Sequence, residues 1–215
     1  MKVQTVIYLC VIFYPIVFAK SVKIIGGTVA DIREFPYMAS FRYPNGVLFC
    51  AGTIISNRHI LTAAHCFEFS NTFDEMKICT GTSELKNCSG TLHKPKHIEI
   101  HPEFTGEMSE TSKVHHDLAV VTVNKCIKFN EVQNKINLPT IDVLPGANAV
   151  FSGWGKTSYP MFDLSAELRK ASTKILSNSE CSNIQEFSVH AEQICAYEKD
   201  GVGACDGDSG GPLIV

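Results

Sequence analysis

The stretch CDGDSGGPLIV, Cys205–Val215, surrounds a single serine with small residues. Ser209 follows an aspartate, and three of the four residues nearest to it are glycines. Glycine readily adopts backbone conformations that other residues avoid, so we expect a sharp turn that presents the Ser209 hydroxyl. The alternative is that the glycines form only an ordinary turn. Motifs elsewhere in the chain decide between the two.

Short apolar runs recur along the chain and are separated by Gly, Pro, Asn and Ser. They have the length and alternation of β-strands, and few stretches keep a helical period. One short helix is expected at SNSEC (177–181) and beyond it. Ser177 or Ser179 would cap a turn from Cys181 to Gln185. The runs that predict strands are YMASFRY (37–43), GTIIS (52–56), HIEIH (97–101), LAVVTV (118–123), NAVFSGW (148–154), TKILS (173–177) and GPLIV (211–215). The sequence therefore predicts a mainly β protein with no linker between independent domains.

The chain begins with a segment typical of exported proteins. Of its 215 residues, 45% are apolar, which is enough to form a buried core. One early lysine, an apolar run over residues 6–18 and the small Ala19 predict a signal peptide over residues 1–19. A membrane anchor is the alternative, but Pro15 interrupts the run, which is short for a hydrocarbon core of ~30 Å. We therefore expect a secreted, extracellular protein.

The cysteines and the charge agree with export. Eight cysteines remain once Cys10 leaves with the signal, and they lack the CxxC spacing of a structural zinc site. Loss of the three lysines in residues 1–23 would change the formal net charge from −3 to −6, which disfavours nucleic acid and membrane surfaces as partners. His93, His97 and His101 recur every four residues, but a solvated strand is the simpler interpretation. We expect no metal ion and no cofactor.

Two further motifs supply partners for the serine. ILTAAHCF (60–67) places His65 beside Cys66, and HHDLAVV (115–121) places Asp117 before an apolar run. Taken singly, such a histidine can be ordinary packing and such an aspartate is a common turn residue. Taken together, the order His, Asp, Ser favours nucleophilic catalysis. A neutral imidazole takes the serine proton, and a carboxylate orients the imidazole and stabilises its cation.

The chain resembles the trypsin and chymotrypsin family of serine proteases. The resemblance implies an all-β fold of two six-stranded antiparallel Greek-key barrels, with the second barrel incomplete because the chain ends at Val215. It also implies the catalytic residues His65, Asp117 and Ser209, and an oxyanion hole formed by the amides of Gly207 and Ser209. The motifs that carry the resemblance are IIGG (24–27), LTAAHC (61–66), HHDLAVV (115–121), SGWGKT (152–157), SNSEC (177–181) and GDSGGP (207–212).

The resemblance further implies activation by proteolysis. Cleavage after Lys23 would free the amine of Ile24, which would pair with Asp208 and hold the oxyanion loop in its active shape. On this interpretation residues 20–23 are an activation propeptide and residues 24–215 are the protease domain. Lys23 implies a trypsin-like activating protease. The alternative for VKIIGG is a strand followed by a glycine turn.

Two residues near the serine bear on the choice of substrate. By resemblance, Gly203 would form the floor of the primary specificity pocket. Its small, neutral character implies a chymotrypsin- or elastase-like preference for aromatic or large aliphatic residues. The alternative is that Gly203 belongs to an ordinary loop and that the pocket wall supplies a charge. Asp206 would lie near the mouth of the pocket and discourage acidic side chains.

Two disulfides are implied by the resemblance. Cys50 would pair with Cys66, and Cys181 with Cys195. Each would close a loop of about 15 residues and contribute ~3 kcal/mol of stability.

Four cysteines are not assigned in this way. Cys79 and Cys88 flank TGTSELKN and could form a hairpin bridge, which is not a standard bridge of the family. Cys126 has no evident partner, and Cys205 would pair with a cysteine downstream. Because the family continues past GDSGGP, we expect the chain to be a partial sequence or a truncated product.

The sequence thus predicts a secreted serine endopeptidase that hydrolyses peptide bonds through an acyl-enzyme on Ser209. Its partners would be protein or peptide substrates, an activating protease and protein inhibitors, and we expect a monomer. One alternative is a catalytically inactive protease homologue that binds or regulates another protein. Another is a truncated venom or salivary component that acts by occupying a partner. Inactive homologues usually lose a triad residue, whereas this chain keeps all three.

Overall fold

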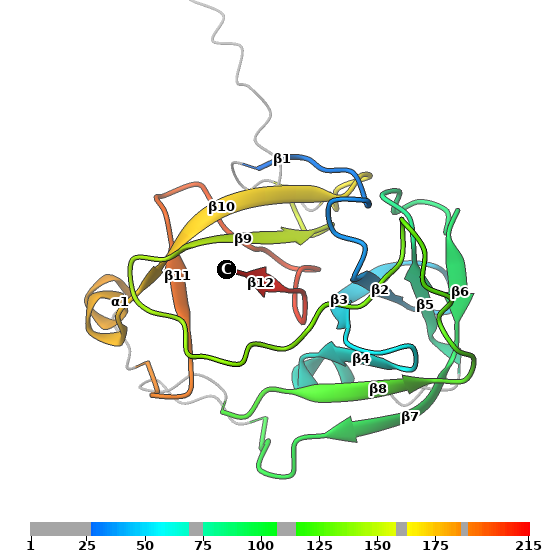
Figure 1. The fold of residues 1–215 in the computed structure, drawn as a ribbon, viewed down its shortest axis with the longest axis horizontal. Coiled ribbons are helices and arrows are strands. Elements are labelled where there is room, and N and C mark those ends of the chain that lie inside the picture. Colours follow the sequence, from blue (N-terminus) through cyan, green and yellow to red (C-terminus); the bar gives the residue numbers. More distant parts are fainter. Residues whose placement is uncertain (1–26, 69–74, 107–114, 158–162, 186–188) are drawn as a thin grey trace, which may run out of the picture.

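A computed structural model gives the fold as two antiparallel sheets, one of seven and one of five strands over the described residues (Figure 1). The expected signal peptide and propeptide lie outside the described residues, as do Lys23 and Ile24. Within the described part of the chain, no helix has the length and the apolar character needed to cross a membrane. The structure describes residues 27–68, 75–106, 115–157, 163–185 and 189–215.

The seven-stranded sheet closes on itself. Its order is β6-β5-β2-β3-β4-β8-β7, and β6 and β7 are separated only by Lys94. Because β6 pairs with β5 and β7 pairs with β8, the two short strands join the ends of the sheet into a barrel. A register shift after Pro95 lets the chain turn this corner. The strands are β2 (Met38–Arg42), β3 (Leu48–Ile54), β4 (His59–Thr62), β5 (Lys77–Thr80), β6 (Thr91–His93), β7 (Pro95–Ile100) and β8 (Ala119–Val123).

The second sheet has the order β1-β10-β9-β12, with β11 also paired to β10. The prediction of an all-β fold built from two antiparallel sheets is therefore confirmed. The strand counts differ from two sets of six, because Lys94 separates β6 from β7 in the first sheet and five strands are described in the second. The strands are β1 (Thr28–Val29), β9 (Asn148–Gly153), β10 (Arg169–Leu176), β11 (Cys195–Tyr197) and β12 (Leu213–Ile214).

The predicted helix is present as α1 (Asn178–Gln185), which starts three residues earlier than expected. Ser177 caps it, because the Glu180 amide donates to the Ser177 Oγ atom at 3.2 Å. In return, the Ser177 amide donates to the Glu180 carboxylate at 2.9 Å. This reciprocal pair is a capping box, and it selects Ser177 over Ser179 as the cap.

Trp154 links the two sheets. Its side chain is 1% exposed and packs in the same apolar cluster as the strands of the first barrel. Its indole nitrogen donates a hydrogen bond of 2.7 Å to the carbonyl of Ser83. A buried indole needs such a partner, so this bond fixes how the second sheet meets the first.

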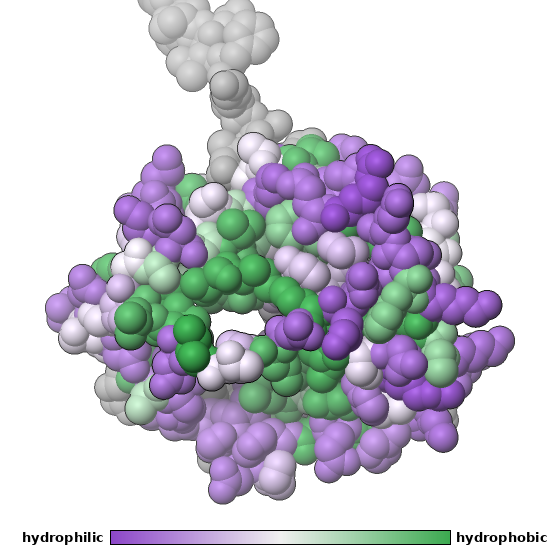
Figure 2. All heavy atoms as spheres, viewed as in Figure 1, coloured by the Kyte–Doolittle hydropathy of each residue, from purple (hydrophilic) through white to green (hydrophobic). Residues whose placement is uncertain are grey.

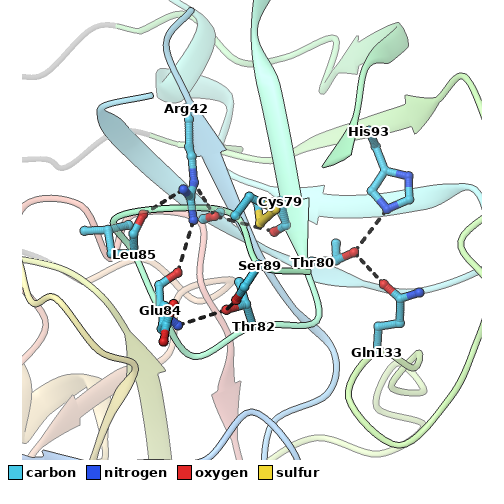
Figure 3. Close-up of a disulfide and its surroundings, with 11 residues drawn as sticks. Arg42, Cys79, Thr80, Thr82, Glu84, Leu85, Ser89, His93 and Gln133 are labelled. Atoms are coloured by element: carbon cyan, nitrogen blue, oxygen red, sulfur yellow. Dashed lines mark hydrogen bonds between the residues drawn. A yellow bond between two sulfur atoms is a disulfide. The ribbon is translucent and has the colours of Figure 1, made fainter. Parts of the chain in front are cut away.

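A disulfide between Cys79 and Cys88 ties β5 to the loop that follows it (Figure 3). The same loop is also held by the buried side chain of Arg42, which is 3% exposed. The Arg42 guanidinium donates to the carbonyl of Leu85 at 2.7 Å and to that of Glu84 at 3.5 Å. The Cys79–Cys88 bridge, which the sequence analysis left undecided, is therefore formed. The bridge and Arg42 anchor the loop at two points.

Removing this bridge is expected to destabilise the protein. In the double variant Cys79→Ser, Cys88→Ser we expect the free energy of unfolding to fall by about 2–3 kcal/mol, because the unfolded chain regains the freedom of a short loop. Denaturant unfolding measures the change. Cys126→Ser is the matched control, since Cys126 is exposed and forms no disulfide with the residues described. Equal unfolding midpoints for the double variant and the parent would contradict the prediction.

Candidate active site

Strand pairing brings the histidine and the aspartate together. β4 runs antiparallel to β8, with Thr62 opposite Ala119. The end of β4 therefore lies beside the start of β8. His65 sits in the 3-10 helix that follows β4, Ala64–Phe67, and Asp117 comes just before β8. Residues far apart in the chain are thus placed at one end of the barrel.

Asp117 holds His65 by two hydrogen bonds. The ring nitrogen Nδ1 of His65 lies 2.7 Å from the Asp117 Oδ2 atom, and the His65 amide donates to Oδ1 at 2.8 Å. A carboxylate only accepts, so Nδ1 carries the proton and Nε2 is left as the basic nitrogen of the neutral ring. This is the tautomer that a general base requires.

The same contact changes the titration of both groups. The hydrogen bond with Asp117 raises the pKa of His65, against the opposing effect of burial. Burial alone would raise the pKa of Asp117, but the hydrogen bonds from the His65 side chain and amide outweigh it and lower that pKa. The pair therefore favours a charged aspartate and a histidine that readily accepts a proton.

The Ser209 loop docks against the first barrel. The amide of Ala51, in β3, donates to the Ser209 carbonyl at 2.8 Å. Gly210 has a φ of +78°, and a Cβ atom there would lie 2.2 Å from the Oγ1 atom of Thr62. Only glycine fits such a position without displacing its neighbours. The close approach brings the serine backbone next to the end of β4, which leads directly to His65.

Two turns shape the backbone on either side of Asp208. Its amide donates to the Cys205 carbonyl at 2.9 Å, and its carbonyl accepts from the Gly211 amide at 2.9 Å. Within the first of these turns Gly207 has a φ of +98°, a conformation that side chains disfavour. The positive φ values of the backbone therefore explain why glycines occur in GDSGGP. The oxyanion role of the Gly207 and Ser209 amides stays a prediction.

Asp208 is 7% exposed. The Gly155 amide donates to one of its carboxylate oxygens at 2.7 Å, and the Cys205 amide donates to the other at 3.0 Å. Burial raises the pKa of Asp208, while these backbone hydrogen bonds oppose the rise. Its expected partner, Ile24, lies outside the described residues. The sequence analysis did not identify Gly155 as a donor, although it lies in the motif SGWGKT.

Gly203 and Asp206 lie in different surroundings. Gly203 lines a pocket of about 240 Å³, in which Asp208 is the only charged residue among those described. A Cβ atom at Gly203 would meet no heavy atom within 4 Å, so the pocket is open there. Asp206 lies outside this lining and pairs with Lys156 at 2.6 Å. On the face in Figure 2, hydrophobic residues border the upper and left edges of an opening beside β11 and β12.

Disulfides support both sides of the site. One joins Cys50 in β3 to Cys66, the neighbour of His65, and the other joins Cys181 in α1 to Cys195 in β11. These are the pairs that the resemblance implied. Cys205 forms no disulfide with the residues described.

The three evenly spaced histidines are not brought together. His93 is buried, and its Nε2 atom lies 3.1 Å from the Thr80 hydroxyl (Figure 3). His97 is exposed and pairs with Glu99 at 2.9 Å. The corner between β6 and β7 separates them, so the periodicity does not produce a shared face. His101 belongs to another cluster, which is described below.

Two antiparallel sheets, with a paired histidine and aspartate beside a glycine-rich serine loop, define the class as a chymotrypsin-like serine protease fold. A family model described as Trypsin matches residues 24–215. The chain is 32% identical to hypodermin-A of Hypoderma lineatum over 198 residues, which cover 90% of this chain and 73% of that protein. It is 34% identical to venom serine protease 34 of Apis mellifera over 201 residues, or 89% of this chain and 48% of that protein. The chain belongs to the trypsin family of serine proteases.

A solved structure supports the fold independently. The chain resembles neuropsin, described as a serine protease expressed in the limbic system of mouse brain, with a TM-score of 0.78. The match covers 87% of this chain and 81% of that one at 23% sequence identity. At this identity the likeness shows the fold alone.

Proposed function

We propose that the chain is a secreted serine endopeptidase in which Ser209 is the nucleophile, His65 the general base and Asp117 the residue that orients the base. The observation that carries this proposal is the pair of hydrogen bonds from His65 to Asp117, at 2.7 and 2.8 Å. The docking of the Ser209 loop on β3 beside this pair supports it. Membership of the trypsin family makes peptide bonds the substrate class.

The chemistry follows from these roles. The Ser209 Oγ atom attacks the scissile carbonyl carbon while Nε2 of His65 takes its proton, and the negative oxygen that forms accepts hydrogen bonds from the amides of Gly207 and Ser209. The C–N bond then breaks, and His65 gives the proton to the leaving amine. Water, activated by the same histidine, hydrolyses the acyl-enzyme and restores Ser209.

The lining beside Gly203, in which Asp208 is the only charged residue among those described, supports a preference for aromatic or large aliphatic residues before the scissile bond. The test uses the protein cleaved after Lys23 and matched chromogenic peptides that end in Phe, Leu, Arg or Lys. We expect kcat/KM to be highest for Phe or Leu. Faster cleavage after Arg or Lys would contradict the specificity. Loss of all cleavage by correctly processed protein would instead favour the inactive homologue that binds a partner.

We also infer that proteolysis activates the enzyme. A buried carboxylate is costly at neutral pH, and Asp208 has only backbone donors among the described residues. The Ile24 amine released by cleavage after Lys23 would supply the missing positive charge. This inference also fits export through a signal peptide at residues 1–19, because a secreted protease needs control before it is released.

Asp208→Asn is expected to block activation. The amine would lose its charged partner, so peptidase activity should fall by about 10²-fold or more, as expected for a broken buried pair worth 3 kcal/mol or above. Cleavage at Lys23–Ile24 is monitored by N-terminal sequencing, and activity is assayed on the processed chain. Asp142→Asn, an exposed position, is the control. Full activity in processed Asp208→Asn protein would overturn the activation mechanism.

The pH dependence of the reaction follows from the His65–Asp117 contact. The general base must be neutral, and Asp117 raises the pKa of His65 above its ordinary value of 6.5. As the pH falls through this raised pKa, His65 becomes protonated and kcat/KM decreases. We therefore expect the acid limb of the profile to lie above pH 6.5. An acid limb at or below that pH would show that Asp117 does not act on the base in this way.

A further inference from the structure

A cluster of histidine and glutamate side chains lies where the segment before β8 meets the segment before β11 (Figure 1). The Nδ1 atom of His115 is 2.6 Å from a carboxylate oxygen of Glu192. The ring of His190 lies close by, with its centroid 3.5 Å from that of His115. His116 is the next residue in the chain. Side chains from both halves of the molecule therefore converge outside the peptidase machinery.

The spacing and the exposure of this cluster suit a metal ion. One ligand atom from each of His115, His116 and Glu192 lies within 4.8 Å of the others. Tetrahedral Zn²⁺ holds nitrogen and oxygen ligands at about 2.0–2.2 Å, which separates the ligand atoms by roughly 3.5 Å. That separation lies within the 4.8 Å that bounds the three ligand atoms. The three side chains are 34–46% exposed, so an ion can enter from solvent.

His116 faces a second carboxylate. Its Nε2 atom lies 3.3 Å from a carboxylate oxygen of Glu103, which leaves Nδ1 to act as the ligand atom. A carboxylate that binds the far nitrogen of a metal-bound histidine orients the ring and raises its basicity. His116 also has a φ of +51°, the only positive value among the described residues other than glycine. Such strain is concentrated at functional positions.

Two other groups of possible ligands fit less well. His101, Glu103 and His116 also lie within 4.8 Å of one another, but the rings of His101 and His116 stack at an angle of 8°. The nitrogen lone pairs lie in the ring planes, so those of parallel rings cannot point at one ion. The third group contains His65 with Cys50 and Cys66, and these two cysteines are bonded to each other.

We propose that His115, His116 and Glu192 bind a divalent transition-metal ion of the Zn²⁺ class, with Glu103 positioning His116. Two imidazoles and one carboxylate favour such an ion over Ca²⁺ or Mg²⁺, which prefer oxygen ligands. A bound ion would tie the segment that carries Asp117 to the segment that leads into β11. The site is separate from the proposed peptidase function, and its test requires no catalysis.

The experiment measures Zn²⁺ binding to tag-free Ser209→Ala protein, which cannot digest itself under the proposed mechanism. Isothermal titration with zinc chloride is expected to show one ion per chain and a rise in Tm at saturation. His115→Ala and the isosteric Glu192→Gln should each weaken binding at least tenfold. His97→Ala is the matched control, because His97 also forms an exposed pair with a glutamate. It should leave the affinity unchanged.

Three results would overturn the assignment. They are the absence of Zn²⁺ binding by the folded parent, unchanged affinity in both His115→Ala and Glu192→Gln, and loss of binding in His101→Ala with no change in Glu192→Gln. The last result would move the ion to the group of His101, Glu103 and His116. Near-UV circular dichroism without metal checks that each variant is folded. If His115→Ala fails this check, Glu192→Gln decides the outcome, since it preserves the shape of the side chain.

Discussion

Ser209→Ala is expected to lower kcat by about 10⁶-fold, because no other hydroxyl is positioned to attack the substrate in the proposed mechanism. The residual rate should still exceed that of water, since the proposed oxyanion donors and the substrate contacts remain. The change removes one oxygen atom and leaves the Ser209 carbonyl free to accept from Ala51. The folded structure should therefore persist, with an unchanged Tm.

The measurement is single-turnover and steady-state hydrolysis by protein cleaved after Lys23. Ser172→Ala, an exposed position on β10, is the control and should keep full activity. A Ser209→Ala variant that retains more than a small fraction of the parental kcat would exclude the acyl-enzyme on this residue. The preparation must be free of the activating protease, whose own activity would otherwise mask the loss.

Asp117→Asn is expected to reduce kcat by about 10⁴-fold while preserving the fold. The asparagine oxygen can still accept from the His65 amide, but its NH₂ group would face the Nδ1 atom. The His65 ring would then carry its proton on Nε2, and a protonated Nε2 cannot accept the proton of Ser209. The loss therefore comes from the wrong tautomer rather than from a displaced side chain.

Nuclear magnetic resonance of ¹⁵N-labelled histidine distinguishes these causes, because it reports which ring nitrogen carries the proton. We expect Nδ1–H in the parent and Nε2–H in Asp117→Asn, alongside the fall in kcat. Asp142→Asn provides a control for the loss of one negative charge at an exposed site. An unchanged tautomer with an unchanged kcat would show that Asp117 does not orient His65.

The sequence predicted the strand-rich class because apolar runs such as LAVVTV and NAVFSGW have strand length and clear boundaries. Each of the seven runs contains part of an observed strand. Five strands of two to four residues lie outside these runs, because so short a segment gives only a weak pattern. They are β1 (Thr28–Val29), β4 (His59–Thr62), β5 (Lys77–Thr80), β6 (Thr91–His93) and β11 (Cys195–Tyr197). The closure of the first sheet into a barrel was implied only by the resemblance to a known family, since the pairing of distant strands has no local signal.

In the candidate site, too, contacts between distant residues had no local pattern in the sequence. His65 and Asp117 are 52 residues apart, and their contact was implied only by the resemblance to a known family. The sequence did not decide whether Cys79 pairs with Cys88, because cysteine spacing alone does not fix a pairing. His115 and Glu192 are separated by 77 residues, so no local pattern could reveal their cluster. The last of these contacts depends on how the two sheets meet.

The most direct test of the account is the site of reaction with a serine-directed phosphonate. Protein cleaved after Lys23 is incubated with the reagent, and mass spectrometry locates the adduct on the digested chain. The account predicts one phosphonate per chain, carried by Ser209, and almost none in His65→Ala protein because the hydroxyl then lacks its base. Folded, correctly processed protein that takes up no phosphonate, or that takes it up on another serine, would contradict the central claim.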